Sequence, residues 1–133
     1  MSAPTGPLAG EVVLDTPARP RSLRLLRMAA ADAATELDLD IDAVESARIA
    51  VDEMAALLLA TGTWSRLIVT LRTDDGCLDV SGIVQGLEGE ASDVHVDRVV
   101  EELLGMCVDS FELLDGPSFR FRIDPKVPAR SVE

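Results

Sequence analysis

The chain has 133 residues, the length of one ordinary domain, and 47% of them are hydrophobic but only 3% aromatic, which predicts a single aliphatic core. Its formal net charge of −12 repels phosphate backbones, so direct nucleic-acid binding is not expected and a partner with a basic surface is favoured. No apolar run approaches the roughly 20 residues that cross a bilayer, and the N-terminus lacks a signal-peptide pattern, so we expect a cytoplasmic protein without membrane contact.

The first half of the chain is expected to form a strand and two helices. Residues 1–10 are rich in Pro, Gly and Ala and are interpreted as a disordered tail. Val12–Leu14 is a β-type run, and apolar residues then recur at helical spacing over Pro20–Leu37. A second helix is predicted over Ile41–Ala60. Its apolar residues fall on two sides, which is typical of a central helix packed between a sheet and another element.

The second half is expected to form a hairpin and then a third helix. Two strands of alternating pattern, Leu67–Arg72 and Leu78–Gln85, flank the turn Asp74-Asp75-Gly76. The third helix is predicted to begin at a capping residue, Ser92 or Asp93, and to run to about Met106. The side chains expected to face inward from this helix are Val96, Val99, Val100, Leu103 and Leu104.

Two further strands are predicted, Val108–Leu114 and Ser118–Asp124. The last strand alternates Phe119, Phe121 and Ile123 on one face with Arg120 and Arg122 on the other. Residues 11–124 are interpreted as one domain and 125–133 as a C-terminal tail. The order β-α-α-β-β-α-β-β favours an α/β two-layer sandwich, a mostly antiparallel sheet with helices on one face.

Few residues carry the patterns of known chemistry. The single histidine, His95, has no partner at the spacing of a catalytic triad, and it is interpreted as a first-turn residue of the third helix. No phosphate-binding loop or metal motif is present, so neither a metal nor a cofactor is expected. Cys77 and Cys107 are interpreted as two buried thiols, with a regulatory disulfide as the alternative.

Glu53 stands out because it interrupts an apolar stretch of the second helix. A carboxylate there is costly unless it is solvated, paired or used. Residues 17–27 and Ala47–Glu53 resemble the anti-sigma-factor serine kinases of bacteria, which have the histidine-kinase-like (GHKL) ATPase fold. The resemblance covers about residues 10–124, and the composition suits a degenerate actinobacterial member.

The resemblance implies a nucleotide pocket that has lost its key groups. The family's magnesium-binding Asn corresponds to Leu57, and the Asp that reads adenine corresponds to Val84, although Gly86 of the same box is kept. The glycine-rich phosphate turn is replaced by acidic residues, and the lid loop is expected to be only a few residues long. Glu53, the family's general base, survives alone. The resemblance therefore implies no ATP binding and no phosphorylation, as in a pseudokinase.

Without ATP binding, the function that the resemblance still implies is regulation of transcription by protein binding, as part of a stress response. It implies capture of an alternative sigma factor, release by an anti-anti-sigma (STAS-type) protein, and a homodimer. The start of the first helix carries the family's partner surface, and Arg21, Arg24 and Arg27 lie there at i, i+3, i+6, although they are also readable as ordinary solvated arginines. The alternatives are an active ATP-dependent serine kinase and a small-molecule-sensing module on the same fold.

Overall fold

Five strands and three helices make up the described part of the chain. The computed structural model describes residues 10–114 and 116–125. The elements in chain order are β1 (Gly10–Pro17), a 3-10 turn η1 (Pro20–Ser22), α1 (Leu23–Glu36), α2 (Ile41–Leu59), β2 (Arg66–Asp74), β3 (Cys77–Gln85), α3 (Arg98–Cys107), β4 (Ser110–Leu114) and β5 (Ser118–Ile123). The tails were expected at 1–10 and 125–133; Gly10 instead begins β1, and residues 1–9 and 126–133, together with Asp115 of the last turn, lie outside the described residues.

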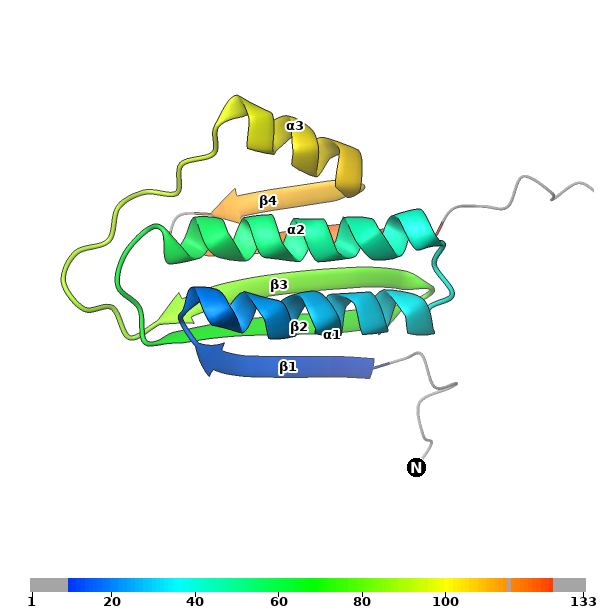
Figure 1. Ribbon diagram of the computed structural model, residues 1–133, viewed down its shortest axis with the longest axis horizontal. Coiled ribbons are helices and arrows are strands. Elements are labelled where there is room, and N and C mark those ends of the chain that lie inside the picture. Colours follow the sequence, from blue (N-terminus) through cyan, green and yellow to red (C-terminus); the bar gives the residue numbers. More distant parts are fainter. Residues whose placement is uncertain (1–9, 115, 126–133) are drawn as a thin grey trace, which may run out of the picture.

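The strands form one sheet in the order β1-β2-β3-β5-β4, and every neighbouring pair is antiparallel. Helices α1 and α2 lie side by side over one face of this sheet, with α2 between α1 and α3 (Figure 1). Because side chains alternate along a strand, β2, β3 and β5 each bury one face under the helices, whereas the two edge strands, β1 and β4, are largely exposed. This arrangement confirms the expected α/β class with an antiparallel sheet and helices on one face.

The core lies between the sheet and the first two helices. Helix α1 contributes one narrow stripe, Leu26, Ala30 and Ala34. Helix α2 buries a wider arc, as expected for a central helix: Ala43, Ala47, Ala50, Val51, Met54, Ala55 and Leu58. From the sheet, the rings of Phe119 and Phe121 stack on the inner face with centroids 6.3 Å apart. The predicted alternation of β5 is therefore confirmed.

The third helix begins later than the sequence predicted. It starts at Arg98, and the side chain of Asp97 caps it by accepting from the backbone N–H of Val100 at 2.9 Å. Ser92 is engaged elsewhere, because its backbone N–H donates to the carbonyl of Thr61 at the end of α2. His95 consequently lies in the exposed segment before the helix.

Two further expectations about this region are wrong. Val99 was expected to face inward, but 75% of it is exposed, since α3 packs only along its opposite side. The segment between β3 and α3 was expected to be short, yet it covers residues 86–97. No helix in the described ranges is both long and apolar enough to span a membrane.

Candidate functional site

The three arginines singled out in the sequence have different environments. Arg21 belongs to the 3-10 turn before α1, and Arg24 lies on the first turn of α1; both are exposed. Among the described residues, neither makes an ion pair. Arg27 is half-buried, and its guanidinium donates to the carboxylate of Asp52 on α2 at 2.6 Å. Arg27 therefore joins two helices of its own protein, whereas Arg21 and Arg24 are available to another molecule.

The solvent side of α1 also displays apolar side chains that the sequence did not single out. Leu25 is 55% exposed and Met28 is 61% exposed. They are three residues apart and so are neighbours on the helix surface, beside Arg24. Helical periodicity places both off the buried stripe of α1, but it does not indicate that they form a surface with Arg24. Exposed apolar side chains next to arginines are the composition that protein interfaces favour.

An open depression runs between α1 and α2 on the same side of the molecule. It is lined by Arg24, Arg27, Met28, Ala31, Asp32, Thr35 and Arg48. Arg48 comes from α2, and its contact with Glu45 is long, at 3.5 Å, between two exposed side chains. Three guanidinium groups thus surround one depression on a strongly acidic protein. We call Arg21, Arg24, Leu25, Met28 and Arg48 the α1 surface.

The positions assigned to a nucleotide pocket are distributed over α2 and the end of β3. Glu53 and Leu57 are half-buried and lie one turn apart on α2. Cys107 of α3 lies against this flank. Burial is the main cause that raises the pKa of its thiol, the charge of Glu53 adds to the increase, and a hydrogen bond with Ser46 opposes it.

The other two pocket positions have structural explanations. Val84 is buried in the core. Gly86 has a φ of +73°, and a Cβ at this position would overlap the hydroxyl of Ser65. The backbone conformation and the close approach of Ser65 explain the glycine without any role in nucleotide binding. Of the four predicted residues, only Glu53 and Leu57 share one surface.

The segment that follows Gly86 is held against the C-terminal end of α2. The backbone N–H of Glu88 donates to the carbonyl of Thr63 at 2.8 Å, and that of Ser92 donates to the carbonyl of Thr61 at 2.6 Å. The indole N–H of Trp64 donates to the hydroxyl of Thr61 at 3.0 Å. These contacts fix residues 88–92 as a strap across the end of α2.

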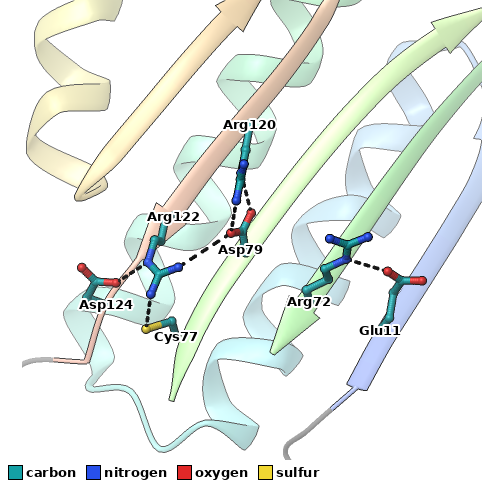
Figure 2. A network of polar contacts seen from close by, with 7 residues as sticks. All are labelled: Glu11, Arg72, Cys77, Asp79, Arg120, Arg122 and Asp124. Carbon is teal, nitrogen blue, oxygen red and sulfur yellow. Dashed lines mark hydrogen bonds and ion pairs between the residues drawn. The ribbon is translucent and has the colours of Figure 1, made fainter. Parts of the chain in front are cut away.

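The sheet face away from α1 and α2 carries a second group of charges (Figure 2). Arg120 donates to both carboxylate oxygens of Asp79, at 3.1 and 2.8 Å. Arg122 donates to Asp124 at 2.7 Å and to the sulfur of Cys77 at 3.0 Å, and its hydrogen bond is the main cause that lowers the pKa of Asp124. Arginines of this face are already neutralised by their neighbours, which distinguishes them from Arg21 and Arg24.

Arg72 of β2 is also paired with a neighbouring carboxylate, since it donates to Glu11 of the edge strand β1 at 2.6 Å.

Within the described residues, no three His, Cys, Asp or Glu side chains are placed to hold a metal ion. A comparison with protein-family models finds no family that matches the chain, and a search among curated proteins finds no matching relative. The geometry of the site is thus the basis for a functional proposal.

Proposed function

We propose that this protein is an anti-sigma factor with a histidine-kinase-like ATPase fold, which sequesters an alternative sigma factor by direct binding. An anti-anti-sigma protein of the STAS type releases the sigma factor by competing for the same surface. The protein acts in the cytoplasm, and neither ATP nor phosphoryl transfer takes part. The two-layer α/β architecture with α1 and α2 on one face of an antiparallel sheet is compatible with this fold.

The observation that carries the proposal is the α1 surface. Arg21 and Arg24 are exposed cations without an ion-pair partner in the described chain, next to the exposed side chains of Leu25 and Met28. Arginine forms paired hydrogen bonds with carboxylates, so the partner is expected to present acidic residues around an apolar contact. The chain as a whole has a formal net charge of −12, and the arginines of the sheet are paired with neighbouring carboxylates, which favours such a partner at this face.

The second candidate, an active serine kinase, is favoured by one observation. Glu53 is half-exposed on α2, so a general base at this position is reachable. Against it, Leu57 has no oxygen to coordinate magnesium, and Val84 is in the core where an adenine-reading carboxylate would be needed. Phosphate transfer from labelled ATP to an anti-anti-sigma protein distinguishes the two functions.

The direct test is capture of purified alternative sigma factors from the same source, measured by calorimetry. The double substitution Arg21→Glu and Arg24→Glu should weaken capture at least tenfold and leave the urea unfolding curve unchanged. Arg98→Glu is the matched control, because Arg98 is 90% exposed on a different helix. If both variants capture the sigma factor as well as the natural protein, the α1 surface is not the binding site. If the natural protein captures no sigma factor, the function itself is refuted.

A further inference from the structure

The open depression between α1 and α2 is a groove that follows α1. Its lining residues on α1 begin at Arg24 and end at Thr35, which corresponds to about three helical turns, or roughly 16 Å. Its volume is about 530 Å³. Ala31 is half-buried in this lining, and its small side chain leaves room for a larger one from a partner. An elongated element that lies along α1 therefore fits the groove.

The positive charges of the groove lie at two levels along α1. Helices α1 and α2 are antiparallel neighbours (Figure 1), and Arg27 pairs with Asp52 between them. Arg48 precedes Asp52 by about one turn of α2. It is therefore about level with Ala31, which follows Arg27 by about one turn of α1. Arg24 is seven residues before Ala31, so the guanidinium groups of Arg24 and Arg48 are attached about 10 Å apart along the groove.

These two arginines keep charge that a partner can use. Among the described residues Arg24 makes no ion pair, and the contact of Arg48 with Glu45 is 3.5 Å long between exposed side chains. Arg27 lies between the two levels and is already neutralised by its partner on α2. One carboxylate, that of Asp32, also lines the groove, without an ion pair in the described part of the chain. The groove thus presents a cation at each of two levels, a neutral pair between them, and one carboxylate near Arg48.

We infer that the groove binds an acidic amphipathic helix of another protein, with carboxylates at positions i and i+7 and an apolar residue at i+4. A third helix packs naturally along the groove between two others. Seven residues of helix span about 10 Å, so both carboxylates reach an arginine, one Arg24 and the other Arg48. The apolar residue between them covers Ala31 and the exposed side chain of Met28, which adapts to the shape of its partner. The inference rests on the proposed function, because it specifies which element of the partner the α1 surface recognises.

Three synthetic helical peptides of equal length and leucine content test the inference. The first carries Glu at i and i+7, the second carries Gln at these positions, and the third carries Glu at i and i+5, on different faces of the helix. Amide chemical-shift mapping on the full chain should place the first peptide on α1 and α2. Its affinity should be at least fivefold higher than that of the other two. Equal affinity of the first and third peptides, binding at another element, or no binding would overturn the inference.

Two substitutions in the groove should change the affinity of the first peptide in opposite directions. Arg48→Gln removes one of the two cations and should weaken binding at least fivefold. Asp32→Asn removes a like charge near the second carboxylate of the peptide and should tighten binding at least twofold. Arg98→Gln is the matched control, because Arg98 is 90% exposed on α3 and should leave the affinity unchanged. Loss of affinity in both groove variants, or no change in either, contradicts the inference.

A linear dicarboxylate is titrated alongside the peptides. If it shifts the same residues with the affinity of the first peptide, the groove takes a small molecule and the inference is overturned. The outcome is separate from that of the proposed function. Peptide binding in the groove without capture of any sigma factor would refute the sigma-factor assignment alone. Capture of a sigma factor without peptide binding would refute the helical occupant alone.

Discussion

The guanidinium of Arg27 on α1 lies 2.6 Å from the carboxylate of Asp52 on α2, across 25 residues of sequence. About one third of each side chain remains exposed, so water only partly screens the pair. The contact joins the two helices that cover the sheet. This contact distinguishes Arg27 from Arg24, which lies three residues earlier on the same helix and has no such partner in the described chain.

The first prediction is that Arg27 contributes to stability and Arg24 does not. Arg27→Gln should lower the free energy of unfolding by about 0.5–1 kcal/mol, because one hydrogen-bonded ion pair is lost and Asp52 is left alone. Arg24→Gln should change it by less than about 0.5 kcal/mol. Urea unfolding followed by circular dichroism measures both. Equal effects would mean that the pair does not persist in solution.

The second prediction concerns ATP. Calorimetric titration with magnesium and ATP should give no binding heat, and Leu57→Asn should not create binding, since a single metal ligand does not replace the missing adenine and phosphate contacts. Glu53→Gln should leave sigma-factor capture unchanged. Micromolar, magnesium-dependent affinity in the natural protein would refute the non-catalytic proposal and favour the kinase.

The sequence predicted correctly the strands in which apolar residues alternate regularly and pack against the single core. The alternation along β2, β3 and β5 has a period of two, and burial confirms it. The predicted start of α3 was wrong. Serine commonly caps helices, but the backbone N–H of Ser92 donates to the carbonyl of Thr61, a contact that forms only in the folded chain. The same limit applies to the candidate site. No local pattern shows that Arg27 meets Asp52 whereas Arg24 has no ion-pair partner among the described residues.

The third prediction uses two glycines that the fold requires. A Cβ on Gly82 would overlap the ring of Phe119, which lies over β3, and Gly86 combines a φ of +73° with the contact to Ser65. Gly82→Ala should therefore cost about 1–3 kcal/mol, since the ring has to move within a packed core. Gly86→Ala should cost about 1–3 kcal/mol through backbone strain, to which the overlap with Ser65 adds.

The matched control for both is Gly105→Ala. Gly105 lies inside α3 and a Cβ there meets nothing within 4 Å. Alanine is the better helix former, so this variant should gain up to about 1 kcal/mol. Thermal and urea unfolding of the three variants give the comparison. Destabilisation of the Gly105 variant to the same degree would show that the loss at the other two positions is not specific.

The last prediction concerns the two thiols, which are both free. Burial is the main cause that raises the pKa of Cys77 and of Cys107, and for Cys77 the guanidinium of Arg122 opposes the rise without cancelling it. At pH 8 both should react with a thiol reagent more slowly in the native protein than in urea, since less thiolate is present and access is limited. Cys77→Ser and Cys107→Ser assign the two rates.

The same shifts determine how stability depends on alkaline pH. Each thiol holds its proton more tightly in the folded chain than in the unfolded chain, so its contribution is complete below the ordinary thiol pKa of 9.0 and is lost as the pH rises through the folded value. Unfolding measured from pH 7 to 10 should therefore show a smaller alkaline loss for the double serine variant than for the natural protein. An identical loss in both would mean that the thiols titrate alike in the folded and unfolded chain. In that case, slow alkylation would reflect access alone.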